Sequence, residues 1–453
     1  MFFASMLVHL ASQSSTNIWL DILEFVVAFL SFFGFVLTSA IILILAERKI
    51  MAYMQDRVGP VHTGPWGLLQ TVADVGKLLL KEDIHVGQAD KALFILAPSV
   101  FMGPVIAAFA VLPFSPYVSL PGTALATGIV YYVAMSSIDV VGVIMAGWSS
   151  NNKYSLIGGL RSAAQMISYE LPLVLALVGV VMLTSILANT GLGTIAVRDI
   201  MIYQAASSYP GKGLGFFYFV FKGFTPWAWF FLQQPLMLII YYICGLAETN
   251  RPPFDLPEAE SELVAGYLTE YSGMRWGLFY LGEYGNMTIV SAIATFLFLG
   301  GFSGPGVAYL TGLNNGGWGL LGNLLAVVYF ITKVYLLCFV FIWVRSTLPR
   351  LRADQLMQFA WLILIPATLF NIIITALIYL VMNGLGSPNW LFQIVLGIVN
   401  FAMLAAFIYL VGRATVATTR RASAPAIRAQ RRATAAGQLP ERAGASVASG
   451  GQQ

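Results

Sequence analysis

Residues 168–189 read SYELPLVLALVGVVMLTSILAN, and Glu170 is the only charged side chain among them. A run of about 20 mostly apolar residues is long enough to cross roughly 30 Å of hydrocarbon as a helix. Similar runs recur along the chain, which is 58% hydrophobic and only 10% charged. A soluble domain carries about 25% charged residues, so this composition predicts a protein whose main solvent is lipid.

Nine runs of this kind are expected to be transmembrane helices, with ends uncertain by a few residues. They lie at 25–46, 92–112, 126–147, 168–189, 228–247, 285–301, 322–344, 359–382 and 391–412. We therefore expect an all-α, polytopic transmembrane helical bundle over residues 1–412. Residues 413–453 are rich in Ala, Arg and Gly without apolar periodicity, which predicts a disordered basic tail that can rest on anionic membrane lipid.

The positive charges predict the orientation of the bundle. With these spans, 20 of the 24 Lys and Arg residues fall in the tail or in loops on the same side as the tail. Loops on the cytoplasmic side of a membrane carry the excess of Lys and Arg. The N-terminus is therefore predicted to lie outside the cell and the tail in the cytoplasm.

The cysteines and histidines do not predict a redox cofactor or a metal site. Cys244 and Cys338 lie in apolar runs without a C-x-x-C pattern, and His9, His62 and His85 fall outside the predicted spans. The sequence also has no Gly-rich dinucleotide or phosphate motif in a strand-to-helix context. Any electrons must come from a partner protein, and no nucleic-acid partner is expected.

Acidic residues are concentrated between the fifth and sixth predicted spans. Seven of the 20 lie there: Glu248, Asp255, Glu258, Glu260, Glu262, Glu270 and Glu283. Asp255 and Glu258 match a capping box and can be explained as helix caps. Glu248, Glu270 and Glu283 lie among apolar residues near membrane depth, where ionisable groups are costly and usually functional. We interpret the group as a whole as functional.

Two further carboxylates lie inside predicted spans. Glu170 is about one turn inside the start of its span, and Asp139 lies in the middle of another. A buried acid can also be protonated and hydrogen-bonded to a neighbouring carbonyl. For Asp139 this structural role and a role in a proton path both remain open.

The segment after the first span predicts an amphipathic helix at the cytoplasmic membrane surface. In WGLLQTVADVGKLLLKED, residues 66–83, Gln70, Asp74, Lys77 and Lys81 form one narrow polar stripe. A surface helix normally turns such a stripe to water. Together with AERKIMAYMQDRVGP, residues 46–60, the stripe could instead form the wall of a pocket for a ligand with a polar head group.

Five motifs, in order, resemble the H-subunit family of bacterial NADH:quinone oxidoreductases and its mitochondrial equivalent. They are AERKIMAYMQDRVGP, GWSSNNKYSLIGGLRSAAQMISYE, AETNRPPFDLPEAESELVAGY, EYSGM and RSTLPRLRADQLM, within a resemblance that covers residues 25–382. The resemblance implies a subunit of the bacterial inner membrane with quinone as its substrate. It also implies a quinone tunnel that opens on the cytoplasmic side. Flavin and iron–sulfur clusters would belong to peripheral partner subunits, and a chain of carboxylates would lead towards antiporter-like membrane subunits.

The resemblance implies roles for individual residues. The tunnel would be lined by Arg48, Arg57 and Asp74, with Arg161 and Arg275 nearby. Proton coupling would involve Glu170, Glu248, Asp255, Glu258, Glu260, Glu262, Glu270 and Glu283, with the loop 345–354 packed beside them. The sequence departs from the family pattern at Asp139, which leaves the proton route open. It also departs in its long outer segment 190–227, and in its ninth span with the basic tail.

Two other functions fit parts of the sequence. The homologous membrane subunit of a membrane-bound hydrogenase would share the carboxylates without a quinone tunnel, but the AERKIMAYMQDRVGP motif favours quinone. A stand-alone secondary transporter would place charges near the membrane midplane between inverted repeats. The sequence shows no such repeat, and its acids are concentrated in one cytoplasmic loop instead.

Overall fold

The computed structural model describes most of the chain. The described residues are 18–84, 86–115, 125–188, 193–205, 229–256, 263–307, 310, 317–386 and 391–413. Within these ranges all regular secondary structure is helical. The chain divides into two units, Met1–Asn400 and Phe401–Gln453, and the tail expected after Arg413 lies outside the described residues.

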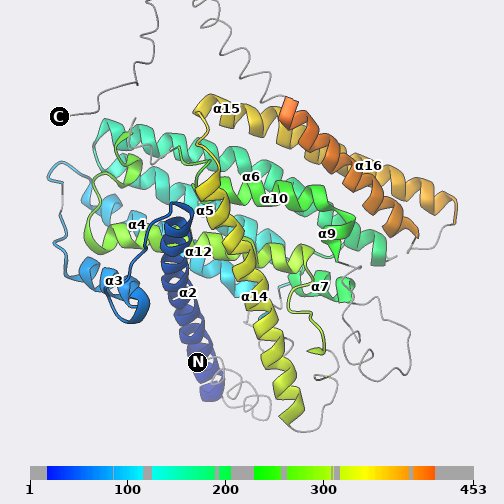
Figure 1. Cartoon of the computed structure of the whole chain (residues 1–453), viewed down its shortest axis with the longest axis horizontal. Coiled ribbons are helices and arrows are strands. Elements are labelled where there is room, and N and C mark those ends of the chain that lie inside the picture. The colour runs from blue at the N-terminus through cyan, green and yellow to red at the C-terminus, as the bar shows by residue number, and fades with distance from the viewer. Residues whose placement is uncertain are drawn as a thin grey trace, which may run out of the picture. The chain divides into compact units, whose positions relative to one another are not determined.

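Figure 1 shows the helices of the first unit, coloured in chain order. In chain order the helices are α2 (Ile18–Met54), η1 (Pro65–Gly67), α3 (Gln70–Leu80), α4 (Lys91–Ala108), η2 (Phe109–Val111), α5 (Gly128–Ser149), α6 (Lys153–Ala188), α7 (Val197–Ala205), α9 (Phe230–Gln233), α10 (Pro235–Glu248), η5 (Gly266–Leu268), α12 (Gly273–Phe298), α14 (Gly317–Thr347), α15 (Ala353–Gln358), the π-helical turn η6 (Phe359–Leu364) and α16 (Ile365–Gly384). A final helix covers Leu391–Arg413.

The protein is an all-α, polytopic membrane protein. Six described helices are long and apolar enough to cross a membrane, namely Lys91–Val111, Gly128–Ser149, Lys153–Leu187, Leu321–Thr347, Ala353–Gly384 and Leu391–Arg413. The other three predicted spans coincide with α2, with the shorter α10, and with α12. Each of the nine predicted runs thus contains helix, with an interruption at Gln234 in the run 228–247, while their number as membrane spans stays a prediction.

Helix α12 lies at the centre of the bundle. It packs against α2, α4, α10 and α14, and it is buried on all sides from Gly282 to Phe298. A helix that is surrounded in this way can carry polar residues only where neighbouring helices bond them. Glu283 and Asn286 are two of the buried polar side chains of α12.

Helices α5 and α6 approach each other closely because glycines face one another. A Cβ added at Gly147 would lie 3.2 Å from the Cα of Gly159, and one added at Gly159 would lie 3.3 Å from the Cα of Gly147. Small residues let helix backbones come together in a membrane, where packing rather than water drives association. This contact holds the acids of α5 and α6 at a fixed spacing.

Candidate functional site: two buried polar clusters and a surface helix

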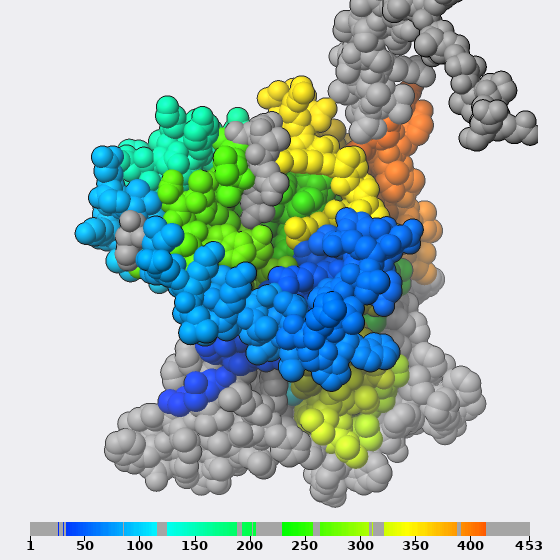
Figure 2. All heavy atoms as spheres, turned by 60° about the vertical axis from the view of Figure 1, so that its left-hand side comes forward, coloured from blue at the N-terminus to red at the C-terminus, as the bar shows by residue number. Residues whose placement is uncertain are grey.

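Helix α3 lies on the surface of the bundle and turns part of its polar stripe inward. Figure 2 shows the segment from the end of α2 through α3, in blue, across the face in view. Gln70 and Asp74 are half-buried, whereas Leu79 and Leu80 are exposed. Asp74 forms an ion pair with Arg48 of α2 and accepts a hydrogen bond from Gln70 at 3.2 Å. This end of the stripe therefore faces protein, while Lys77 and Lys81 remain exposed.

The other arginines expected near a quinone tunnel occupy different places. Arg57 is exposed and donates from Nε to Gln55 at 2.7 Å. Arg161 is half-buried on α6. Arg275, in the first turn of α12, forms an ion pair with Asp83 at 3.0 Å. The structure thus joins Arg48 to Asp74 but engages Arg275 with a carboxylate that the sequence analysis did not single out.

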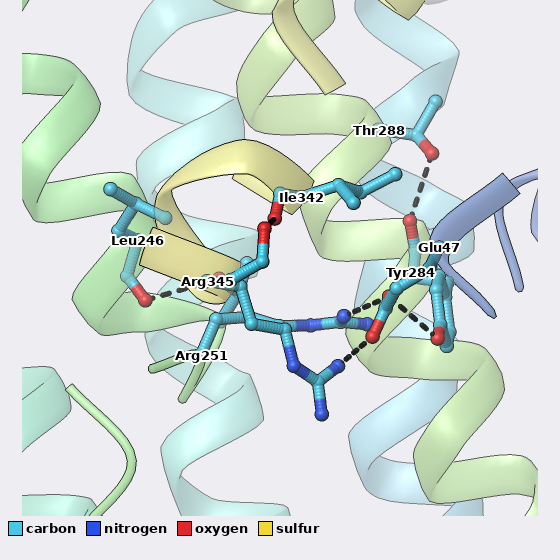
Figure 3. Close-up of polar contacts among 9 residues, drawn as sticks. Glu47, Leu246, Arg251, Tyr284, Thr288, Ile342 and Arg345 are labelled. Atoms are coloured by element: carbon cyan, nitrogen blue, oxygen red, sulfur yellow. Dashed lines mark hydrogen bonds and ion pairs between the residues drawn. The ribbon is translucent and has the colours of Figure 1, made fainter. Parts of the chain in front are cut away.

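A buried ion cluster gathers around Glu47 near the C-terminal end of α2 (Figure 3). We call Glu47, Arg251, Tyr284 and Arg345 the Glu47 cluster. The Glu47 carboxylate accepts from Arg251 Nη1 at 2.5 Å and from the Tyr284 hydroxyl at 2.9 Å, and it also pairs with Arg345. The side chains of Arg251 and Glu47 are only 5% and 4% exposed, so this pair is withdrawn from water. Two guanidinium groups and one carboxylate give the cluster a net charge of +1.

The loop after α10 holds Arg251 in place. Gln165 of α6 donates from Nε2 to the carbonyl of Ala247 at 2.8 Å and to that of Phe254 at 2.5 Å, which fixes both ends of the loop. The Arg251 guanidinium stacks on the Tyr284 ring at 4.2 Å. Burial alone would lower the pKa of Arg251, but the neighbouring Glu47, Tyr284 and Glu283 together outweigh burial and raise that pKa well above its usual range. The arginine is therefore permanently charged.

A second cluster joins acids from α6 and α10 through two adjacent serines of α5. We call Glu170, Glu248, Ser136 and Ser137 the Glu248 cluster. Ser137 donates to Glu170, and Ser136 lies within hydrogen-bonding reach of Glu248. Glu248 is 8% exposed, and its Oε2 makes no hydrogen bond within the described part of the chain. One turn of α5 thus presents hydroxyls to two carboxyl groups from different helices.

Asp139 lies one turn after Ser136 on α5 and is almost completely buried. Asn286 of α12 donates to its Oδ2 at 2.7 Å. Its Oδ1 has no hydrogen-bond partner among the described residues. Asp139 is close enough to Glu248 for the two to interact electrostatically. Asp139 therefore lies beside the Glu248 cluster, and its hydrogen-bond partner is an amide rather than a carbonyl. Whether its role is structural or part of a proton path stays a prediction.

The other predicted acids are distributed along the same region. Glu283 of α12 accepts from the Tyr267 hydroxyl at 3.3 Å, and Glu270 accepts from Asn152 at 2.8 Å. Asp255 lies in the loop after α10 and is half-buried. Three of the predicted acids, Glu258, Glu260 and Glu262, lie outside the described residues.

The sequence analysis missed the partners that give these acids their surroundings. Arg251 and Arg345 stand inside quoted motifs but had no assigned role. Ser136, Ser137 and Asn286 carry no signal in the sequence beyond being polar residues in predicted spans. Among the described residues, no group of three or more His, Cys, Asp and Glu side chains is placed to hold a metal ion.

Comparison with known proteins places these features in a family. The sequence model of the NADH dehydrogenase family matches residues 26–376. A relative from Brevibacillus brevis is 45% identical over 369 residues, which are 81% of this chain and 96% of the relative. One from Dehalococcoides mccartyi is 43% identical over 398 residues, or 88% of this chain and 96% of the relative. One from Bacillus cytotoxicus is 46% identical over 336 residues, or 74% and 88% of the two chains.

Each of these three relatives is named as the H subunit of an NADH-quinone oxidoreductase. The match covers the residues of both buried clusters and of the surface helix. At this identity and coverage the three relatives and this chain are members of one family. The chain belongs to the NADH dehydrogenase family, as a relative of the H subunits of the NADH-quinone oxidoreductases.

Proposed function

We propose that the chain is the membrane subunit that couples quinone reduction to proton translocation in an NADH:quinone oxidoreductase. The observation that carries the proposal is the pair of buried clusters at the two ends of one short segment. Glu248 belongs to the Glu248 cluster, and Arg251, less than one helical turn later, belongs to the Glu47 cluster. A change of charge near one cluster therefore has a direct mechanical and electrostatic route to the other.

The chemistry of the quinone suits the positive cluster. Reduction by two electrons develops negative charge on the quinone head group, and fixed arginines stabilise such charge without reorganisation. The Glu47 cluster carries a net charge of +1, and Arg48, paired with Asp74, lies one residue further along α2. We infer that Arg48, Arg57 and Asp74 shape the quinone path, with the clustered acids of α5, α6, α10 and α12 as the proton-coupling groups.

Energies show why several groups must act together. A unit charge about 10 Å from a carboxylate, at an effective dielectric constant of about 20, is worth roughly 1.7 kcal/mol, or about 1.2 pKa units. Moving one proton against about 150 mV costs about 3.5 kcal/mol. One electrostatic interaction at this distance is too weak. The proposal therefore requires that Glu248, Glu170, Glu283 and the loop between α10 and α12 respond together.

The proposed function implies partner subunits that supply electrons and partner subunits that carry protons. We propose that electrons reach the quinone from peripheral subunits that carry flavin and iron–sulfur clusters. The protons must leave through neighbouring antiporter-like membrane subunits. We also propose that residues 258–262, with their three acids, belong to the coupling loop, and that the complex lies in the bacterial inner membrane.

Replacing Asp74 with asparagine is expected to lower quinone reductase activity about tenfold. The variant keeps the shape of the side chain but removes the charge that holds Arg48, and about 1.4 kcal/mol of lost transition-state stabilisation is a factor of ten. Electron transfer from NADH to a soluble artificial acceptor should be unchanged. Lys77→Gln, on the same helix but exposed, is the matched control and should retain both activities. Equal loss of both activities in Asp74→Asn would indicate failed assembly instead.

Residues after Arg413 are expected to lie in the cytoplasm. A reporter enzyme that is active only in the cytoplasm should therefore be active when fused there, and one that is active only outside should not. The basis is the distribution of Lys and Arg residues, of which 20 of 24 lie on the predicted cytoplasmic side. A fusion after Ala205, in the predicted outer segment, is the matched control and should show the opposite pattern. Outside activity at Arg413 would show that the number of spans is even rather than odd.

A further inference from the structure

A lysine lies inside an apolar helix and has no role in the proposed coupling. Lys333 is near the middle of the segment Leu321–Thr347 of α14, and apart from Arg345 it is the only charged residue of that segment. Ionisable groups at membrane depth are costly, usually functional, and often belong to proton paths. The contacts of Lys333 indicate a different function.

The Lys333 ammonium group is held by backbone carbonyls. Its Nζ donates to the carbonyl oxygens of Leu299 at 2.8 Å, Gly301 at 2.9 Å and Ser303 at 2.8 Å. It also lies 4.3 Å from the centroid of the Trp229 ring, and the face of such a ring attracts cations. An ammonium group has three N–H donors, and all three are used here. A neutral amine has only two, and its lone pair would face a carbonyl oxygen, so these contacts fit the charged form.

The three carbonyls follow the C-terminal end of α12. Helix α12 ends at Phe298, and the last four carbonyls of a helix lack partners within it. The negative end of the helix dipole also lies there, so a positive charge at that end is stabilising. Lys333 of the neighbouring helix α14 therefore supplies both a charge and the hydrogen-bond donors that suit this end.

Gln204 of α7 bonds the last turn of the same helix. Its Nε2 donates to the carbonyls of Phe296 at 2.9 Å and Leu297 at 3.1 Å. Its Oε1 accepts from the Gly300 N–H at 2.9 Å, and the residue is only 1% exposed. Side chains from two other helices therefore close the C-terminal end of α12, and both bond backbone atoms between residues 296 and 303.

We propose that Lys333 is a positioning residue, a fixed cation that anchors the C-terminal end of α12 and takes no part in proton transfer. Glu283 lies in the N-terminal half of α12, about 22 Å from the anchored end at about 1.5 Å per residue. An anchored C-terminal end restricts any movement of α12 to the half that carries Glu283. The anchor itself follows from the contacts of Lys333, whereas its consequence for Glu283 rests on the proposed coupling function.

Amide hydrogen exchange in the intact complex tests the anchor. The Leu299 and Gly301 N–H groups bond to the Thr295 carbonyl at 3.1 and 2.9 Å. Lys333→Met has a similar length but neither charge nor donors, so exchange of these two amides should become about 5- to 30-fold faster. Thr332→Val removes a neighbouring hydroxyl that bonds only its own helix, and this matched control should exchange as the wild type does. Unchanged exchange in Lys333→Met would overturn the proposal, whatever is found for coupling.

Lys333→Arg separates an anchor from a proton carrier. Arginine keeps the charge and the donors but cannot release its proton in a protein. An anchor predicts that Lys333→Arg assembles more completely than Lys333→Met and takes up the wild-type number of protons per NADH oxidised. A carrier predicts that pumping fails in both variants at normal amounts of complex, which would overturn the proposal. Loss of the complex in Lys333→Arg as severe as in Lys333→Met would also overturn it, because charge and donors would then not be what the site requires. Where Lys333→Met does not assemble, the arginine variant alone decides.

Discussion

Replacing Glu47 with glutamine is expected to remove most of the assembled complex from the membrane. Glu47 is 3% exposed, and its carboxylate is shared by Arg251, Arg345 and the Tyr284 hydroxyl. Glutamine keeps the shape but removes the carboxylate that is hydrogen-bonded to the buried Arg251. Breaking a buried ion pair on one side costs about 3–5 kcal/mol, a large part of the total stability of a typical domain. Native gel electrophoresis of solubilised membranes measures the loss.

The matched control is the ion pair at the surface. Asp83 pairs with Arg275 at 3.0 Å, but its side chain is 41% exposed. Exposed pairs contribute about 0–1 kcal/mol, so Asp83→Asn should leave the amount of complex near that of the wild type. Wild-type amounts of complex in Glu47→Gln would contradict the assigned role of the buried pair. Equal losses in both variants would show that any change of charge in this region disturbs assembly.

The Glu47 cluster also marks a limit of what the sequence predicts. Glu47 is separated from Arg251 by 204 residues and from Arg345 by 298, so no local pattern connects them. Each residue alone is consistent with a charged group at the end of a span. Only the packing of α2, α10, α12 and α14 in the bundle, with the loop after α10, brings the three charges together. The cluster can be identified only from the three-dimensional structure, in which these residues lie next to one another.

Helix existence was easier to predict than helix length. The apolar run 168–189 coincides with the second half of α6, but the helix begins at Lys153. Apolarity reports how much of a helix is surrounded by lipid or apolar side chains, whereas the backbone hydrogen bonds continue into KYSLIGGLRSAAQMI. This extra length brings Gln165 to the loop after α10, where it fixes the segment that carries Arg251.

For the acids, the sequence predicted which residues are important but not which side chains they contact. Glu170 and Glu248 were singled out because charge is costly among apolar residues. Their connection through Ser136 and Ser137 could not be predicted, since serines are common in membrane helices and usually bond their own backbone. Ser137 also makes such a bond, to the carbonyl of Val133 at 2.9 Å. The side chain of Ser137 thus serves both the helix and the acid.

Glu248→Gln is expected to leave the complex assembled but to lower quinone reduction and proton pumping together. Glutamine has the shape of glutamate and can still accept from Ser136, so the loss of stability should be small. It cannot carry a proton, however. The loss of a positioned proton-transfer group costs at least about 100-fold where that group limits the rate. Proton uptake per NADH oxidised and the rate of quinone reduction, both normalised to assembled complex, provide the measurement.

A cap residue of similar charge separates coupling from stability. Asp90 caps α4 by accepting from the Ala92 N–H at 3.2 Å, and losing such a cap costs about 1 kcal/mol. Asp90→Ala should therefore reduce the amount of complex while each assembled complex turns over normally, the reverse of the pattern expected for Glu248→Gln. Normal turnover and a normal proton ratio in Glu248→Gln would assign Glu248 a structural role. The proton route would then have to pass through Glu283 of α12 and the coupling loop without the Glu248 cluster.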